Sequence, residues 1–492
     1  MMNVLRRSAM LCLLVPALWL VPSARPLRAA EGLRAVSHLL VIYLENRSFD
    51  NLLGEFPGAD GIADAGERAI QRDRAGQAFT SLPQPARRGP FDSRENPKPV
   101  RSLALGELPN RPFAIDAIQP EVTATAHTRD LVHRFYTHKA QIHGGANDRF
   151  AALSDAGGLA MGYYSRRTME ASNLWRLAQA NLLLDHFHQG AFGGSFLNHF
   201  WLVCGCAPVW PHPPPRLRAQ LDGEGIPLAK QDNAIVAAGH GDFAVNSLQS
   251  VYLNDGSNPE DLLRGQHMIT IGDRLSERGI GWAWYAGGWS LAIKADRSPQ
   301  EGDILDRQLH FQWHHQPFAY FRRFDPATER GRQQRRQHLK DAGELEADIA
   351  SGRLPPVAFY KPSGNLDSHP DYSTPQAGDE QLGQIAAWMQ ASPMKASYAI
   401  IILFDESGGF WDHAPPPMGR MAGRRADFFG PGSRVPALIV SPLVRKGEID
   451  HTPYETTSIL RLITERFRLK PLPSPRARTV TSLSRAFISA RR

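Results

Sequence analysis

Short apolar runs, each about the length of one strand, recur along the chain and predict a buried sheet. They lie at 37–44 (SHLLVIYL), 182–185, 356–360 (PVAFY), 398–404 (YAIIILF) and 437–440 (ALIV). A strand that is covered on both faces has a continuous apolar sequence, whereas a half-exposed strand alternates polar and apolar residues. The run at 398–404 is the strongest of these candidates.

Apolar residues at helical spacing predict helices between these strands. The clearest amphipathic segments are 173–180, 270–278, 379–390 and 456–467. Thr270 fits the N-cap of the second segment, and Gly279 fits its end. The alternation of strands and helices predicts an α/β fold in which a sheet lies between layers of helices.

Two stretches interrupt this pattern and are expected to be insertions. Residues 61–112 are polar and rich in Pro, Arg and Gly, which predicts a long surface loop. Residues 316–354 contain a strongly charged, helix-like segment at 329–353, which predicts a surface helix or a lid. Such charge runs are more typical of solvated faces than of binding patches.

The first 30 residues have the layout of a secretory signal peptide. Two arginines precede an apolar run at 11–21, and a small, proline-containing segment follows. We expect cleavage between residues 24 and 31. The apolar run is short for a bilayer crossing, and a retained anchor or a short buried helix are the alternatives. We therefore expect a periplasmic or secreted protein, with residues 31–492 forming a single catalytic domain without a transmembrane segment.

Loss of this leader changes the interpretation of charge and cysteine content. The leader holds four arginines and no acidic residue, so the formal net charge of +7 falls to +3 and indicates no nucleic acid partner. Cys12 would be lost with it. Cys204 and Cys206 are only two positions apart, which is too close for an easy disulfide, so we expect a buried thiol pair.

Acidic pairs follow the two strongest strands. Residues 37–44 lead into Glu45–Asn46, and residues 398–404 lead into Asp405–Glu406. If the strands are parallel neighbours, these side chains meet at the carboxyl edge of the sheet. One acidic residue after a strand usually marks a turn, but two such pairs favour a metal site. Their oxygen atoms suit one divalent ion of the Ca²⁺, Mg²⁺ or Mn²⁺ class.

A third feature is Gly193–Gly194–Ser195, which precedes a helix-like pattern. Free N–H groups and the dipole at a helix N-terminus favour a phosphate oxygen and a serine alkoxide. A nearby metal would activate the hydroxyl further. The alternative is that Ser195 is only an N-cap.

Several of the 18 histidines stand in settings that suit chemistry. They are His133, His314, His315, His369 and His413. Imidazolium groups can hold phosphate oxygens and protonate a leaving alkoxide. The adjacent His314 and His315 would point in opposite directions on a strand, so both can reach one site only from a loop.

Six motifs in one order resemble a known family. They are ENRSFDNLLGEFPGADGI, HGGANDRF, FGGSFLNHFWL, FQWHHQPFAYF, KPSGNLDSHPDY and FDESGGFWDHAPPP. Together they resemble the bacterial phosphoesterases that unite phospholipases C with secreted acid phosphatases, and the acid phosphatase branch is the more similar. The resemblance implies an alkaline-phosphatase-like fold, with a central, mostly parallel sheet sandwiched between helices.

The resemblance also implies roles for individual residues. It implies metal ligation by Glu45, Asn46, Asp405, Glu406 and Ser195, with Ser195 also the nucleophile, and phosphoryl contacts by His133, His314, His315, His369 and Asn246. Phospholipase members tend to have threonine at the position of Ser195, so the serine favours an acid phosphatase that acts on phosphomonoesters through a phosphoserine. The alternatives are a phospholipase C acting on phospholipids and a non-catalytic periplasmic phosphate-binding protein. If the histidines must be charged, activity falls as the pH rises through roughly 6–7.

Overall fold

A central sheet of eight strands organises the computed structural model, which describes residues 32–84, 108–120, 122–229, 232–235, 242–252, 258–295, 308–417 and 427–487. The predicted leader and residues 85–107 of the predicted loop lie outside these ranges. In spatial order the strands are β11 (Glu448–Asp450), β4 (Leu182–Leu184), β10 (Ala437–Val440), β9 (Tyr398–Phe404), β1 (His38–Leu44), β8 (Val357–Lys361), β6 (Trp282–Ala286) and β7 (Leu339–Asp341).

The pairing confirms the predicted α/β class and the mostly parallel sheet. Among the described strands of this sheet, β10 alone runs antiparallel to its neighbours. β1 lies between β9 and β8, with Leu44 opposite Phe404 and Leu39 opposite Val357. The buried interiors of β1 and β9 explain their continuous apolar sequences. All five predicted strands are present, whereas β6, β7 and β11 were not predicted.

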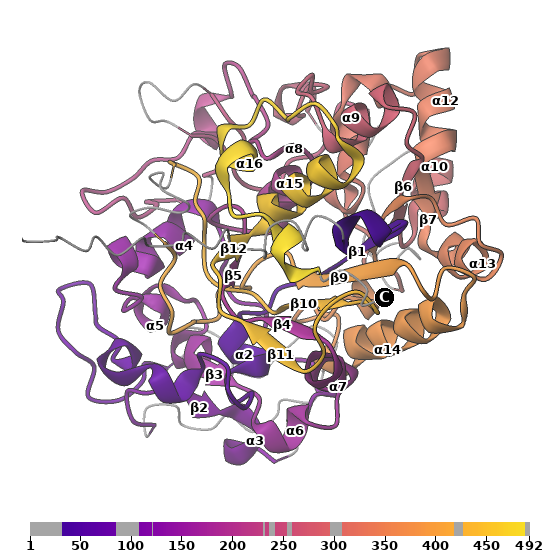
Figure 1. The fold of residues 1–492 in the computed structure, drawn as a ribbon. Coiled ribbons are helices and arrows are strands. Elements are labelled where there is room, and N and C mark those ends of the chain that lie inside the picture. The colour runs from indigo at the N-terminus through magenta and orange to yellow at the C-terminus, as the bar shows by residue number, and fades with distance from the viewer. Residues whose placement is uncertain are drawn as a thin grey trace, which may run out of the picture.

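Helices cover both faces of the sheet (Figure 1). α7 (Asn173–Ala180) packs against β4 and β10, and it contacts α14 (Pro375–Ala391), which in turn contacts α13 (Leu345–Ala350). The group formed by α8 (Ser195–Cys204), α9 (Ile271–Glu277) and α15 (Thr456–Phe467) covers the opposite face. The four predicted helices correspond to α7, α9, α14 and α15, and Thr270 is the N-cap of α9 as expected.

The remaining elements are short. They are the helices α2 (Phe49–Leu53), α3 (Ile115–Ile118), α4 (Phe135–Ile142), α5 (Phe150–Leu153), α6 (Arg166–Met169), α10 (Trp289–Ala295), α12 (Glu329–His338) and α16 (Pro475–Thr479), and the strand pairs β2 (Phe113–Ala114) with β3 (Gly162–Tyr163) and β5 (Phe187–His188) with β12 (Tyr454–Glu455).

The charged segment at 329–353 differs from its prediction as one surface helix. α12 is followed directly by β7, which pairs with β6 at the edge of the sheet, with Trp284 opposite Leu339. β7 offers one apolar residue, Leu339, so its sequence carries too weak a signal for a strand. By contrast, the described part of 61–112 is irregular, with two short 3₁₀ turns at Ile62–Asp64 and Gly66–Ala69.

The cysteine prediction was wrong, because Cys204 and Cys206 form a disulfide. α8 ends at Cys204, and Gly205 adopts a left-handed conformation with φ of 61°. The chain therefore turns back on itself, and the two Cα atoms lie 5.2 Å apart, within the range that a disulfide requires. Sequence separation alone had not allowed for this turn.

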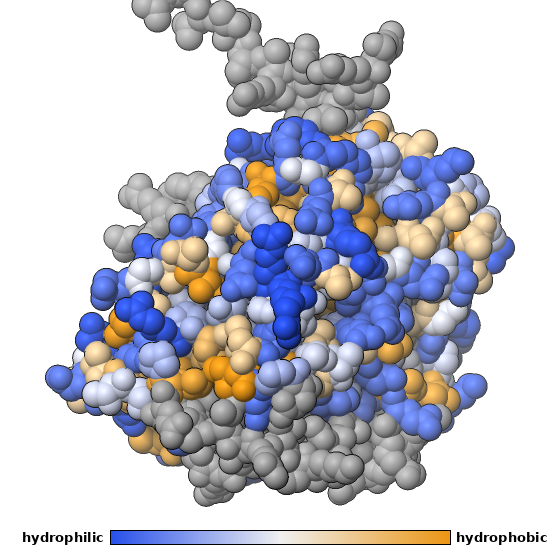
Figure 2. All heavy atoms as spheres, turned by 90° about the horizontal axis from the view of Figure 1, so that it is seen from below, coloured by the Kyte–Doolittle hydropathy of each residue, from blue (hydrophilic) through white to orange (hydrophobic). Residues whose placement is uncertain are grey.

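One hydrophobic core extends from Leu33 to Phe487 and includes the strands of the sheet. Figure 2 shows a face on which hydrophilic residues predominate, with hydrophobic residues in small groups between them. Among the described residues, none of the helices combines the length and apolar sequence that a bilayer crossing requires.

A buried guanidinium joins the loop after β9 to the first part of the chain. Arg434 is fully buried; its Nε donates to Asp412 at 2.8 Å, and its Nη2 donates to Asp50 at 3.2 Å. Its Nη1 donates to the backbone oxygens of Asp60 and Asp185. The charges and hydrogen bonds of this group therefore hold four separate segments together.

We expect Arg434→Met to lower the free energy of unfolding by ~3–5 kcal/mol, because the substitution leaves buried carboxylates without their cation. Urea denaturation measures the loss. Arg445→Met is the matched control, since Arg445 forms an exposed ion pair with Glu448 and its removal should cost at most about 1 kcal/mol. Equal effects of the two substitutions would contradict this role of Arg434.

Candidate functional site

The parallel pairing of β1 and β9 brings the two acidic pairs together. Asp405 donates its backbone N–H to the Leu44 carbonyl at 2.9 Å, so the residues after the two strands stand side by side. Glu45, Asn46, Asp405 and Glu406 are all fully buried. Asn46 has a left-handed backbone with φ of 72°, which turns the chain sharply at the end of β1.

The carboxylates of Asp405 and Glu406 each use one oxygen to fix the loop and leave the other free. Asp405 Oδ1 accepts from the Glu406 N–H at 2.7 Å, and Glu406 Oε2 accepts from the Gly408 N–H at 2.6 Å. Asp405 Oδ2 and Glu406 Oε1 are buried without a hydrogen-bond partner in the described part of the chain. Burial, followed by neighbouring carboxylates, raises the pKa of both groups well above the usual range. This arrangement favours a cation.

Glu45 has a histidine and a lysine on its other side. Its Oε1 lies 2.9 Å from His315 Nε2 and 3.4 Å from Lys361 Nζ. Burial raises the pKa of Glu45, but the nearby Lys361 and His315 outweigh it and hold the pKa well below its usual range. Lys361, which also pairs with Asp367 at 2.6 Å, is the last residue of β8. Sequence reasoning missed it, although it follows the same strand-end rule as Glu45.

Ser195 is the first residue of α8, and Gly194 is the N-cap. The N-cap alternative for Ser195 is therefore not what the structure shows. Its hydroxyl instead donates to Asn46 Oδ1 at 3.1 Å, next to the acidic pairs.

The buried Gln189 fixes the loop that presents Ser195. Its Nε2 donates to the Gly193 carbonyl at 3.1 Å, and its Oε1 accepts from the Ser407 N–H at 3.0 Å. One side chain thus couples the loop before α8 to the loop after β9. No sequence signal identified this residue.

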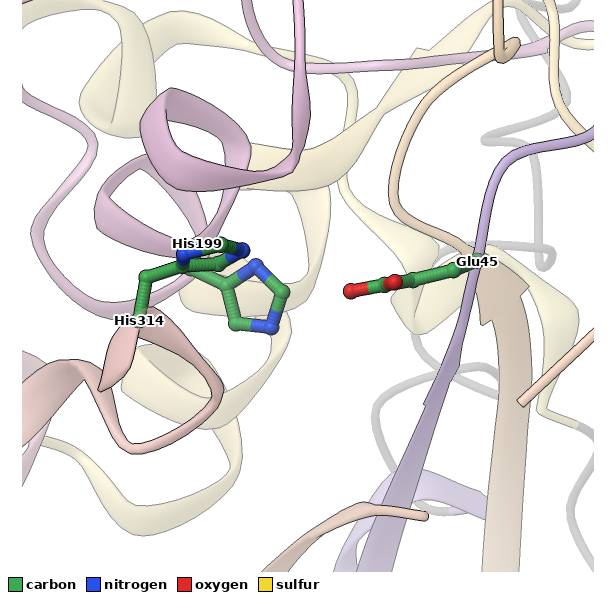
Figure 3. A group of neighbouring side chains, drawn as sticks. All are labelled: Glu45, His199 and His314. Carbon is green, nitrogen blue, oxygen red and sulfur yellow. The ribbon is translucent and has the colours of Figure 1, made fainter. Parts of the chain in front are cut away.

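His199 is a further residue that sequence reasoning missed. It lies four residues after Ser195, one helical turn along the same face of α8. Its Nδ1 is 2.8 Å from the Ser195 carbonyl. A metal-ligating atom from each of Glu45, His199 and His314 lies within 4.8 Å of the others. Figure 3 shows the Glu45 carboxylate at the end of β1 pointing toward the two imidazoles.

A pocket beside these groups collects most of the remaining predicted residues. Its lining includes Ser195, His133, Asn246, His314 and His369. The two adjacent histidines belong to a 3₁₀ turn (Trp313–His315), so both approach the site. His315 lies behind the pocket lining, against Glu45.

Hydrogen bonds and ring stacking fix two of the lining side chains, Asn246 and His369. Asn246 Oδ1 accepts from the Phe135 N–H at 3.0 Å, and its Nδ2 donates to the Asp232 carbonyl. Since an amide nitrogen has two hydrogens, one donor of Asn246 is left for a ligand. The His369 ring stacks on Tyr372 with its centroid 4.2 Å away. His413 takes no part in this pocket and joins the Arg434 group through Asp50.

Burial lowers the pKa of the histidines around Glu45 and in the pocket. It lowers the pKa of His199 to about 3 and that of His315 to about 4. It also lowers the pKa of His314 well below the usual range, and that of His369 to a lesser extent. These rings therefore become charged at a lower pH than the value of 6–7 expected from ordinary histidines.

The site lies at the carboxyl edge of a mostly parallel α/β sheet. It combines a buried acidic group with a serine at a helix N-terminus, an arrangement typical of a hydrolase. The chain belongs to the phosphoesterase family, because the sequence model of that family matches residues 36–470.

The similar proteins include named phospholipases C. The hemolytic phospholipase C of Pseudomonas aeruginosa is 23% identical over 458 residues, which cover 88% of this chain and 53% of that protein. Phospholipase C B of Mycobacterium tuberculosis is 22% identical over 466 residues, which cover 89% and 74%. The chain spans 53–59% of the length of the first relatives that it matches. A solved structure of an alkaline phosphatase superfamily protein from Vibrio parahaemolyticus is 10% identical, with a TM-score of 0.31 and coverage of 66% and 64%.

We expect Gly193→Ala to disturb the loop that presents Ser195. Gly193 has φ of 84°, and an added Cβ would lie 2.6 Å from the Phe135 backbone. Gly76 is the matched control, because it has φ of 83° and open space around it. Backbone strain of ~1–2 kcal/mol is common to both variants, and the clash should cost Gly193→Ala about 1–3 kcal/mol more. Urea denaturation compares the two, and equal losses would show that the close approach is unimportant.

Proposed function

We propose that this chain is an exported, metal-dependent phosphoesterase that hydrolyses phosphomonoesters through a phosphoserine, as acid phosphatases of the family do. One observation carries the proposal. The Ser195 hydroxyl at the N-terminus of α8 lies against Asn46, beside two buried carboxylate oxygens that have no hydrogen-bond partner in the described chain. A binding protein for phosphate needs no such nucleophile, so that alternative leaves Ser195 without a role.

The residues proposed to hold the metal are Glu45, Asn46, Asp405, Glu406 and Ser195. Their buried oxygens and their excess of negative charge fit a divalent cation. His199 and His314 add nitrogen donors beside Glu45, which extends the suitable ions from the Ca²⁺, Mg²⁺ and Mn²⁺ class to Zn²⁺ and iron. When bound, such an ion supplies positive charge that stabilises the serine alkoxide and the phosphoryl oxygens.

The side chains divide the proposed reaction among them. Ser195 Oγ attacks the phosphorus, while N–H groups at the start of α8 favour the charge on the phosphoryl oxygens. His133, His314 and Asn246 line the pocket and orient the phosphoryl group. His369 or His315 gives a proton to the leaving alkoxide, and His369 is the better placed because it lines the pocket. Water then hydrolyses the phosphoserine.

Phospholipase C is the second candidate, since the named relatives carry that activity in their names. Against it stands Ser195 itself, where phospholipases of the family tend to have threonine. The substrate is in either case a phosphate ester, a small molecule or a phospholipid. We also propose that residues 31–492 act as one catalytic domain, which the continuous core from Leu33 to Phe487 supports, and that the leader directs it to the periplasm or outside the cell.

Ser195→Ala should lower kcat for p-nitrophenyl phosphate by at least about 10³-fold, because it removes the nucleophile. Circular dichroism should match the native protein. Ser247→Ala is the control, since Ser247 lines the same pocket but has no proposed chemical role; it should keep most of its activity. Retention of more than about a tenth of the native rate in Ser195→Ala would remove Ser195 from the nucleophile role.

The same measurements on p-nitrophenylphosphorylcholine separate the two candidate functions. A phosphomonoesterase acts faster on p-nitrophenyl phosphate, and a phospholipase C acts faster on the choline diester. Preference for the diester in the native protein, with the same loss in Ser195→Ala, would replace acid phosphatase by phospholipase C.

The pH dependence tests the role of His369. A general acid must be protonated, and burial lowers the pKa of His369 below 6.5. The kcat/KM, which reports the free enzyme, should therefore fall as the pH rises through a value below 6.5. His369→Asn should remove this limb of the profile. A native profile that stays flat up to about pH 9, well above the histidine range, would contradict the proposal.

A further inference from the structure

A second group of metal-ligating side chains lies where β4 and β11 end. These strands are parallel neighbours, with Leu184 opposite Asp450. Asp185 and His451 follow them directly and therefore stand side by side. The rule that places Glu45 beside Asp405 thus acts a second time, at the other end of the strand order.

The contacts within this group are close. His451 Nδ1 lies 2.7 Å from Asp185 Oδ2, and His186 Nε2 lies 3.1 Å from Asp60 Oδ2. A ligand atom from each of Asp185, His186 and His451 lies within 4.8 Å of the others. Two imidazoles and a carboxylate from the ends of two strands converge there, and a second carboxylate, that of Asp60, lies beside them.

One oxygen in this group is left over. Asp185 is fully buried, and its Oδ2 accepts hydrogen bonds from the Asp60 N–H and from His451. Its Oδ1 is buried and has no hydrogen-bond partner in the part of the chain that the structure describes. A buried carboxylate oxygen without a donor is costly unless something else compensates it.

The charges around the group also favour a cation. The connected carboxylates are those of Asp50, Asp60, Asp185 and Asp412. Two cations face them, the Arg434 guanidinium and His413 when its imidazole is counted as charged. By this count the carboxylates outnumber the cations by two, and the other groups that face Asp60 and Asp185 are the imidazoles of His186 and His451. Such an excess of carboxylates suits a divalent ion.

We propose that Asp185, His186 and His451, with Asp60 beside them, form a second metal site that is separate from the phosphoesterase site. Imidazole nitrogen and carboxylate oxygen together suit Zn²⁺ better than Ca²⁺ or Mg²⁺. β10 separates β4 from β9, so the site lies roughly 10 Å or more from Asp405. The His451 side chain is 59% exposed, which gives an ion a route of entry.

The proposed role is structural. The ion joins the loop that contains Asp60 to the ends of two strands that are far apart in the sequence, and so fixes the β11 edge of the sheet. This inference does not depend on the proposed function, because no residue of the group takes part in the reaction.

The experiment counts metal in the purified full chain. Native protein and variants are dialysed against Zn²⁺, and bound metal per chain is measured by inductively coupled plasma mass spectrometry. The variants are His451→Asn, His186→Asn with His451→Asn, and the control His143→Asn. His143 forms an exposed pair with Asp148 that has no further ligand in the groups identified among the described residues.

Native protein and His143→Asn should bind one more equivalent of Zn²⁺ than the double variant. His451→Asn should bind this equivalent at least about tenfold more weakly. Phosphatase activity should be unchanged in all of them, which also shows that they are folded. Equal zinc content in the native protein and the double variant, or equal affinity in His451→Asn, would identify an adventitious ion only and overturn the proposal.

A second measurement, thermal unfolding, does not depend on the number of zinc ions bound. Saturating Zn²⁺ should raise the Tm of the native protein above that of the double variant, since an ion that binds only the folded state stabilises it. An equal rise in Tm in the native protein and the double variant would also overturn the proposal of a second metal site.

Discussion

The structure depends on one constraint: two parallel strands end in carboxylates inside the protein. β1 and β9 pair along their whole length, so Glu45 and Asp405 must lie side by side and out of water. Like charges in such a place are unfavourable unless cations or donors compensate them. Lys361 and His315 do this for Glu45. Asp405 Oδ2 and Glu406 Oε1 accept no hydrogen bond from the described part of the chain, and the nearest imidazole nitrogens, those of His199 and His133, lie 3.9 Å and 3.8 Å away.

The surrounding elements serve to hold this group still. Gln189 links the loop before Ser195 to the loop after Glu406, and Asn198 accepts and donates hydrogen bonds along the same loop. Both side chains are buried, so the two loops move together or not at all. The position of Ser195 relative to the carboxylates is therefore set by the packed core rather than by a flexible surface segment, as a preorganised site requires.

The sequence predicted the centre of the fold well because fully buried strands are continuous apolar runs. The ends of β1 and β9 were also predictable, because a polar pair directly after a continuous apolar run is easily recognised. β7 was missed because an edge strand needs little apolar sequence, and the disulfide was missed because Gly205 turns the chain. Gln189 could not be identified, because its importance comes from neighbours that are distant in the sequence. Lys361 stands at the end of a predicted strand, but its partner Glu45 is distant in the sequence, so this signal was overlooked. His199 had a signal, its spacing of four residues from Ser195, which became meaningful only once the helix face was known.

The strand order also bears on how the protein forms. β1 comes first in the described chain, yet both of its partners, β8 and β9, come more than 300 residues later. Until residues 357–361 are available, β1 has neither of its neighbours in the sheet, and Glu45 cannot meet Asp405 until β9 is also complete. Contacts of such long range make folding slow and leave apolar strands exposed in the meantime. If the chain is exported as it is made, it would thus cross the membrane unfolded. The group of Glu45, Asn46, Asp405 and Glu406 would then assemble only after export.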